Sequence, residues 1–266
     1  MYQPILSVQE YYARLNEYIL QVGLPDDIEG LKNWDEERGI LRAAMGEADG
    51  RSVLDCSCGW GRQAIALAKS GWQVTATDVA GSSMDFARQC AREEEVPIDF
   101  RVCDMRDLAQ HFRETFDWVI SCYALYEILD DENIQRAVDG MYAALKRGGH
   151  CYVRLRDMEF LMEERPRYWF EGEKRVPNGR VICISDWDFE SETHVIHIDA
   201  FLREDERYQD YRRWRMETPG YRKRLLGEAE LEQFLHAAGF RQIAFLPREG
   251  PWCEHEVVAS KQGGEQ

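Results

Sequence analysis

The chain has 266 residues and a formal net charge of −16, from 33 Lys and Arg against 49 Asp and Glu. Hydrophobic residues make up 44%, which suffices for one large domain or a domain with an appended subdomain and argues against intrinsic disorder. Because so acidic a chain repels phosphate backbones, we expect no nucleic-acid partner.

Membrane segments and structural disulfides are not expected either. No apolar run is long enough to span a bilayer, and the first twenty residues are interrupted by Glu10, Arg14 and Glu17. None of the eight cysteines forms a C-x-x-C pair, and most lie in apolar runs, which is typical of buried thiols in a reducing compartment. We therefore expect a soluble cytoplasmic protein without a metal site, and we leave open whether it forms a homo-oligomer.

Residues 1–50 are predicted to be helical, with an apolar face formed by Tyr11, Tyr12, Leu15, Tyr18 and Ile19, and to act as an N-terminal lid. From residue 51 onwards, short apolar runs alternate with helical stretches. The predicted strands cover residues 52–55, 73–78, 98–102, 116–121 and 151–156. Helices are predicted over residues 63–70 and 83–92, and a later helix that includes Leu145 is expected to close at Gly148-Gly149.

The alternation stops at residues 158–224, which are rich in Trp, Tyr and Arg. Residues 181–187 and 194–202 are predicted to form an antiparallel pair within an insertion that covers the substrate. A helix at 231–238 and a hairpin at 241–246 and 256–260 complete the chain. The fold prediction is α/β: a Rossmann-like, doubly wound, mostly parallel seven-stranded sheet with a final antiparallel hairpin, plus a small antiparallel β insertion. Its core is assigned to residues 51–157 and 225–262.

A glycine-bearing turn follows the first predicted strand. Gly59 and Gly61 remove side chains that would keep a ligand away from a helix N-terminus. Asp55 ends the strand, and its carboxylate would repel the pyrophosphate of NAD or FAD. This arrangement favours a ligand that presents a cation, such as the α-ammonium of a methionine moiety.

Two further carboxylates follow the next predicted strands. Asp78 lies where an acidic residue can accept hydrogen bonds from both hydroxyls of a ribose. Asp104 and Met105 are placed to bond an adenine amino group and to cover its ring. The three strand ends together predict a site for an adenosine bearing a cationic side arm.

This pattern resembles the class I S-adenosylmethionine-dependent methyltransferases. The matching features are the run from Leu54 to Gly61, Asp78, Asp104, Phe116-Asp117 and Gly148-Gly149 in the usual order. Ser57 stands where most members have glycine or alanine, and we expect binding to survive this change. The resemblance implies S-adenosyl-L-methionine as cofactor, with contacts at Trp34, Arg38, Asp55, Cys58, Gly59, Gly61, Asp78, Val79, Met84, Asp104, Met105, Arg106 and Cys122.

The end of the fifth predicted strand suggests the acceptor. Arg154 and Arg156 are predicted to share one face there, and an arginine can clamp a carboxylate through two hydrogen bonds. Arg156 and the residues after it resemble the glycine and sarcosine N-methyltransferases, in which aromatic side chains also enclose the amino acid. Tyr123 and Tyr126 are candidates for that enclosure, as are Tyr168, Trp169 and Trp187. The asparagine that those enzymes carry after strand four is absent, so the acceptor can be larger than glycine.

The sequence therefore predicts an enzyme that methylates a small, carboxylate-bearing metabolite, with the amine of an amino acid favoured. Arg156, Tyr123, Tyr126 and Glu127 are the candidate catalytic residues, and Glu127 is expected to hold an ammonium or act as a base. O- or S-methylation of a secondary metabolite and a non-catalytic S-adenosylmethionine-binding module remain alternatives.

Overall fold

The computed structural model describes residues 5–21, 32–176, 179–205, 214–217, 220–247 and 254–263. The chain divides into two compact units, one of residues 31–159 and 226–266 and a smaller one of residues 1–30 and 160–225. We expected residues 1–50 to form one segment, but residues 31–50 cluster with the larger unit. The reason is that α2 (Trp34–Met45) packs on α3 (Arg62–Lys69) of that unit.

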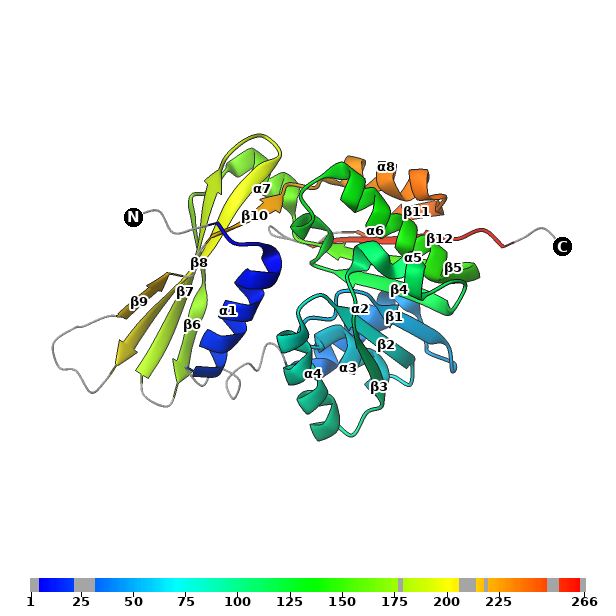
Figure 1. The fold of residues 1–266 in the computed structure, drawn as a ribbon, viewed down its shortest axis with the longest axis horizontal. Coiled ribbons are helices and arrows are strands. Elements are labelled where there is room, and N and C mark those ends of the chain that lie inside the picture. The colour runs from blue at the N-terminus through cyan, green and yellow to red at the C-terminus, as the bar shows by residue number, and fades with distance from the viewer. Residues whose placement is uncertain are drawn as a thin grey trace. The chain divides into compact units, whose positions relative to one another are not determined.

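The larger unit contains the predicted seven-stranded sheet (Figure 1). Its strands run in the order β11-β12-β5-β4-β1-β2-β3, and β1 to β5 are parallel to one another. The antiparallel pairs β12–β5 and β11–β12 confirm the final hairpin. The strand bounds are β1 (Ser52–Asp55), β2 (Gln73–Asp78), β3 (Ile98–Val102), β4 (Phe116–Cys122), β5 (Leu145–Leu155), β11 (Arg241–Phe245) and β12 (His255–Ser260).

The start of β5 differs from the prediction. The helix α6 (Asp131–Ala144) ends before Leu145, and β5 begins there, so Gly148-Gly149 lies inside the strand instead of closing the helix. Pairing of β5 with β4 is irregular between Phe116 and Trp118, and Gly148 has φ +76°. A side chain at Gly149 would meet the carbonyl oxygen of Asp117 at 3.0 Å, so glycine is needed there for close backbone approach.

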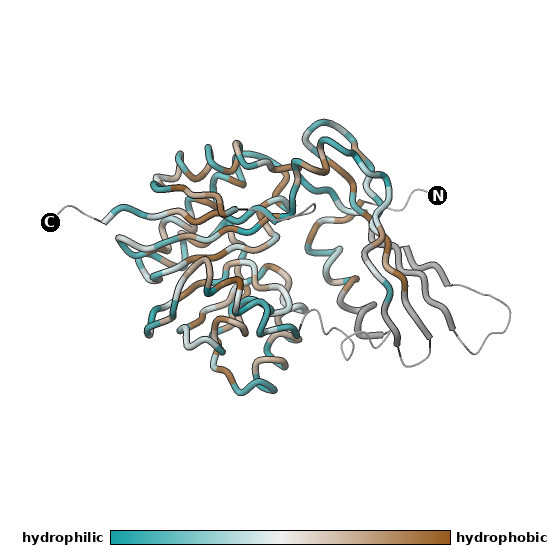
Figure 2. The backbone as a smooth tube through the Cα atoms, turned by 180° about the vertical axis from the view of Figure 1, so that it is seen from behind, coloured by the Kyte–Doolittle hydropathy of each residue, from teal (hydrophilic) through white to brown (hydrophobic). Residues whose placement is uncertain are grey.

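The helices that cover the sheet form two groups, and helices of the same group contact one another. The first group is α2, α3 and α4 (Gly81–Glu93), and the second is α5 (Leu108–His111), α6 and α8 (Glu228–Ala238). Colour alternates along these helices in Figure 2 because each turns an apolar stripe to the core. Short 3₁₀ turns, η2 (Met105–Asp107) and η3 (Leu125–Glu127), follow β3 and β4.

The smaller unit is a five-stranded sheet with the path β10-β8-β7-β6 and with β9 paired to β8. Pairing of β7 (Gly179–Phe189) with β8 (His194–Asp205) confirms the predicted antiparallel pair. The prediction missed β6 (Tyr168–Val176), β9 (Trp214–Glu217) and β10 (Tyr221–Arg224), because β6 and β10 are rich in charge and β9 is only four residues long. The remaining helices are α1 (Val8–Gln21) and α7 (Met158–Glu164).

Aromatic stacking builds the core of the smaller unit. Tyr11 of α1 stacks on Tyr221 with ring centroids 3.9 Å apart, and Trp187 stacks on His197 at 4.2 Å. Trp187 is therefore a core residue of this unit, whereas Tyr168 is exposed. The side chains of Tyr18 and Ile19, also expected on this face, lie outside the described residues. In the part of the chain that the structure describes, no helix has the length and apolarity needed to cross a membrane.

Candidate cofactor and acceptor site

The glycine turn between β1 and α3 is held by backbone hydrogen bonds. The Cys58 N–H donates to the carbonyl of Thr77 at 2.9 Å, and the Gly61 N–H donates to the carbonyl of Cys58 at 2.7 Å. The Ser57 hydroxyl accepts from the backbone N–H of Cys122 at 3.1 Å. Ser57 thus links the turn to the end of β4, which gives the departure from glycine or alanine a structural role.

The two glycines of the turn have different functions. At Gly61 (φ +88°) an added Cβ would lie 2.8 Å from the Cβ of Ala87, so this residue is glycine because α4 packs against it. At Gly59 (φ +48°) an added Cβ would meet nothing within 4 Å among the described atoms. The open space above Gly59 is therefore the place where a ligand can approach the backbone.

Asp55 is the buried acid of the site. It is 1% exposed, and its Oδ1 accepts the Ser57 N–H at 3.2 Å. Among the described residues, its Oδ2 has no hydrogen-bond partner. Burial raises the pKa of Asp55 to about 7, and the charges of Asp78 and Glu37 add to the rise. A buried carboxylate in this state is completed by a cation, so Asp55 fits the α-ammonium of S-adenosylmethionine.

Asp78 connects the glycine turn to the loop after β2. Its Oδ2 accepts the Gly59 N–H and its Oδ1 accepts the Ala80 N–H, both at 2.8 Å. Burial raises the pKa of Asp78, while these backbone hydrogen bonds oppose the rise. Each carboxylate oxygen keeps capacity for a second donor, so the arrangement remains compatible with a ribose diol.

Asp104 begins the 3₁₀ turn η2. It accepts the backbone N–H of Arg106 at 2.9 Å and pairs with the guanidinium of the same residue. These contacts with Arg106 hold the pKa of Asp104 below its ordinary value although partial burial acts to raise it. Asp104 can therefore bond an adenine only by sharing its oxygens with Arg106.

Several other predicted cofactor contacts are core or surface residues. Trp34 packs against Ile65, Cys90 and Ala91, and Arg38 donates to Asp35 and Ser70 on the surface. Met84 is fully buried in the core cluster that also contains Cys58 and Cys122. Val79 and Met105 lie in the loops after β2 and β3, half-buried and buried respectively. The structure therefore joins Gly59 and Asp78 by a direct hydrogen bond and brings Asp55 near enough to Asp78 for their charges to interact, but it gives Trp34 and Arg38 other partners.

An ion-pair cluster that the sequence does not predict lies at the ends of β4 and β5. Glu37 of α2 is completely buried between Arg154 (Nη1 to Oε1, 2.9 Å) and Arg62 (Nε to Oε2, 2.9 Å). Arg154 also pairs with Glu254, and Arg62 is the first residue of α3. The cluster therefore ties α2 to the helix that follows the glycine turn. In the sequence, Glu37 can be recognised as a buried residue only because it shares the apolar face of α2 with Trp34, Leu41 and Met45.

The structure gives Arg154 and Arg156 different surroundings. β5 ends at Leu155, so strand alternation does not extend to Arg156, and Arg154 is committed to Glu37 and Glu254. Arg156 is half-buried, and its charge lowers the pKa of Tyr126 against the larger effect of burial, which raises it. Arg156 thus lies near Tyr126 at the sheet's carboxyl edge.

The two tyrosines after β4 remain protonated. Tyr123 has a left-handed backbone (φ +60°), and its hydroxyl bonds to Glu254. Burial, with the nearby Glu254 charge, raises the pKa of Tyr123 well above its usual range. Tyr126 is also buried, and its pKa is likewise raised. Neither phenol can serve as a base near neutral pH, and Glu127 lies beside them in η3.

Most of the cysteine thiols are buried. The seven cysteines in the described ranges are free, and all except Cys183 are buried. Burial raises the pKa of Cys58 and Cys122 well above that of an ordinary thiol, so neither is a nucleophile. Cys253 lies outside the described residues.

Comparison with known proteins identifies the larger unit. Residues 53–149 match the family described as "Methyltransferase domain". Among curated proteins, the ubiquinone biosynthesis O-methyltransferase of Chromobacterium violaceum is 32% identical over 127 residues, covering 44% of this chain and 55% of that protein. The corresponding protein of Xanthomonas campestris pv. campestris is 36% identical over 111 residues, covering 42% and 45%. The chain spans about half the length of these relatives.

Solved structures share the fold over most of the chain. An S-adenosylmethionine-dependent methyltransferase from Clostridium acetobutylicum has a TM-score of 0.65 at 17% identity, with 95% of this chain and 99% of that one covered. An amino pentose methyltransferase from Micromonospora echinaspora, solved with S-adenosylmethionine bound, also has a TM-score of 0.65, at 18% identity over 87% and 91% of the two chains. None of these comparisons singles out the glycine and sarcosine enzymes. The family match covers residues 53–149, which include the glycine turn, and the fold of the chain is similar to that of solved S-adenosylmethionine-dependent methyltransferases.

Proposed function

We propose that this protein is an enzyme that transfers the methyl group of S-adenosylmethionine to a small-molecule acceptor. The observation that carries the proposal is Asp55, a buried carboxylate with one oxygen lacking a hydrogen-bond partner among the described residues. It ends the strand that leads into Gly59, whose backbone has open space above it. A ligand that brings an ammonium close to that backbone completes the site.

In this proposal the chain's main tasks are to hold both reactants in line and to exclude water. Asp55 holds the cofactor's ammonium, Asp78 the ribose hydroxyls, and Asp104 with Met105 the adenine. S-adenosylmethionine supplies the electrophilic methyl group. Because the Tyr123 and Tyr126 phenols stay protonated, the acceptor itself must provide the neutral amine or the ionised oxygen that attacks.

We favour an acceptor with a carboxylate and an amine, as in an amino acid. Support comes from Arg156, which follows β5 and lies near the buried Tyr126 at the edge of the sheet where this fold binds ligands. Arg154, the other arginine there, is already neutralised by Glu37 and Glu254. O-methylation is the second candidate because the curated relatives are named O-methyltransferases.

The test is methyl transfer from labelled S-adenosylmethionine to a panel of amino acids, amino sugars and phenols. We expect turnover with an amine that carries a carboxylate, with a rate that rises between pH 6 and 9 because the amine must be neutral to attack. If only phenols are methylated, the proposed reaction is O-methylation and not N-methylation. Cofactor binding without turnover of any acceptor would favour a non-catalytic binding module.

Asp55→Asn provides the site-specific control. It should abolish S-adenosylmethionine binding in calorimetry, because an amide cannot neutralise the ammonium. The matched variant is Asp99→Asn on β3, which removes an exposed carboxylate paired only with Arg101 in the described structure. Equal cofactor affinity in the two variants would contradict the assignment of Asp55.

A further inference from the structure

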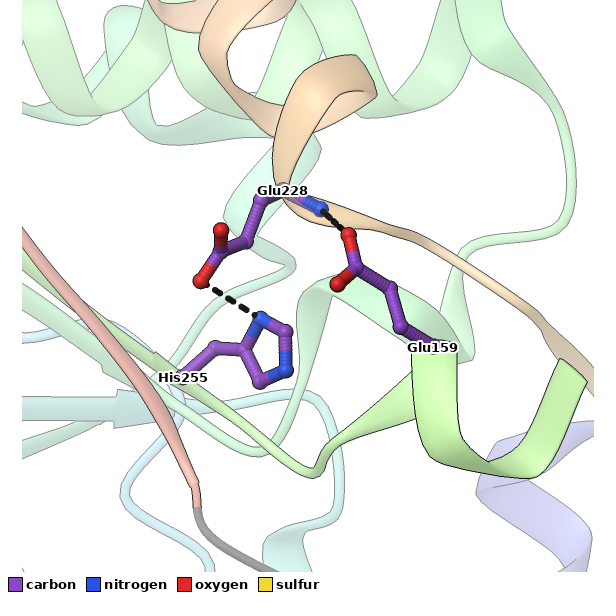
Figure 3. Close-up of side chains that lie close together, drawn as sticks. All are labelled: Glu159, Glu228 and His255. Carbon is purple, nitrogen blue, oxygen red and sulfur yellow. Dashed lines mark hydrogen bonds and ion pairs between the residues drawn. The ribbon is translucent and has the colours of Figure 1, made fainter. Parts of the chain in front are cut away.

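A second group of chemistry-bearing side chains lies in the larger unit, away from the glycine turn in sequence. Glu159, Glu228 and His255 place their ligand atoms within 4.8 Å of one another. Figure 3 shows the carboxylates of Glu159 and Glu228 and the imidazole of His255 converging from α7, α8 and β12. The methyl-transfer proposal uses none of these residues.

Two carboxylates flank the buried imidazole of His255. It is 3% exposed, and its Nε2 lies 2.9 Å from Oδ1 of Asp157, while its Nδ1 lies 3.0 Å from Oε1 of Glu228. Both ring nitrogens therefore face carboxylate oxygens. A metal ion bound at one of these nitrogens would lie beside a carboxylate oxygen that can also ligate it.

The geometry has the parts of a metal centre. A carboxylate that accepts from one imidazole nitrogen and fixes the other toward a metal is the usual outer partner of a metal-binding histidine. Here Asp157 occupies that position, and Nδ1 of His255 points to Glu228. Glu159 accepts the backbone N–H of Glu228 at 3.2 Å through Oε1, which holds its carboxylate beside the other two side chains.

We propose that Glu159, Glu228 and His255 bind a divalent transition-metal ion of the Zn²⁺ type, with Asp157 as the outer partner of the histidine. One imidazole with two carboxylates favours such an ion over Mg²⁺ and Ca²⁺, which prefer oxygen ligands alone. A dication also offsets most of the negative charge of the three carboxylates. The cysteine spacing that argues against a zinc site does not bear on ligands brought together from residues 159, 228 and 255.

The position of the site indicates a structural function. The chain leaves the larger unit after Glu159 and re-enters it at Leu226, so two of the three ligands, Glu159 and Glu228, lie at or next to these crossings. A bound ion would fasten both crossing segments to β12. Metal binding should therefore raise the melting temperature of the full chain by mass action, without any change in methyl-transfer chemistry.

The experiment is titration of chelator-treated, full-length protein with Zn²⁺ and Co²⁺ by calorimetry and absorption spectroscopy. We expect one ion per chain, weaker binding as the pH falls, and Co²⁺ bands without thiolate charge transfer. Glu228→Gln should abolish binding, and Asp157→Asn should weaken it about 10- to 100-fold. The matched controls are Glu232→Gln and His236→Gln, which alter an exposed Glu–His pair on α8 and should bind the ion like the parent protein.

Circular dichroism of each variant distinguishes a folded protein that has lost a metal-ligating side chain from an unfolded one. Failure of the folded parent protein to bind either ion would overturn the proposal. Unchanged affinity of folded Glu228→Gln for the metal ion would also overturn it. So would a Co²⁺–thiolate absorption band that persists in this variant. None of these outcomes depends on methyl transfer, so the proposed function and the metal site stand or fall separately.

Discussion

Asp55→Asn should stabilise the cofactor-free protein at pH 8 while destroying its ability to bind S-adenosylmethionine. The pKa of Asp55 is about 7 in the folded chain against 3.8 for an ordinary aspartate, chiefly because of burial. The folded chain therefore binds the proton more tightly than the unfolded chain, and its stability falls as pH rises from about 4 to 7. Above pH 7 the full cost of burying the charge is present.

The magnitude follows from the two pKa values. A difference of about three pKa units corresponds to roughly 4 kcal/mol of folding free energy at pH 8. The asparagine removes this cost, but its buried amide lacks a partner and costs about 1–3 kcal/mol. We therefore expect a net gain of about 2 kcal/mol at pH 8. At pH 5 the benefit should be smaller by about 2–3 kcal/mol, because wild-type Asp55 is then protonated in the folded chain.

Urea unfolding of the two proteins without cofactor, at pH 8 and pH 5, measures this difference. The exposed control Asp99→Asn should change stability by less than about 0.5 kcal/mol at either pH. Saturating S-adenosylmethionine should stabilise the wild type and leave Asp55→Asn unchanged. The reasoning is refuted if Asp55→Asn destabilises the protein equally at pH 5 and pH 8.

Four further substitutions test the rest of the site. Gly61→Ala should lower the free energy of unfolding by about 2–4 kcal/mol, because the added methyl group meets Ala87 and the backbone is left-handed. Gly59→Ala should lower it by only about 1 kcal/mol but weaken cofactor binding about ten-fold or more. Thermal melts measure the loss of stability, and calorimetry measures the loss of cofactor affinity. Glu37→Gln should destabilise the fold by about 3 kcal/mol in urea, against less than about 0.5 kcal/mol for the exposed Arg147→Gln. Arg156→Gln should raise KM for a carboxylate acceptor about ten-fold with cofactor affinity unchanged, and an unaltered KM would eliminate the carboxylate clamp.

Local patterns predicted the strands well and placed Asp55 and Asp78 at strand ends, because both depend on short-range sequence. The bounds of β1, β2 and β3 match the prediction because each apolar run is bracketed by turn residues. Asp55 and Asp78 follow directly from their positions at strand ends. The sequence alone could not show that Asp55 lacks a partner for one oxygen, since that depends on the packing of α3 around it.

Contacts between distant segments were not predictable in this way. Glu37 looks like one of three acids in the first turn of a helix, a place where acids favour the helix dipole. Its burial depends on Arg154, which lies 117 residues away. Likewise, His255 comes close to Glu159 and Glu228 only when β12 pairs with β5. Charged residues inside an apolar stripe are therefore the sequence signal to examine first.

The close approach of Glu159 and Glu228 has an evolutionary consequence. With the Glu228 N–H only 3.2 Å from a Glu159 oxygen, the chain returns to the larger unit beside the point where it left. An insertion whose two ends meet can grow, shrink or be exchanged without stretching the sheet that receives it. Descendants of such a chain can therefore vary the length and sequence of this segment while the ends of β1, β2 and β3 are inherited unchanged.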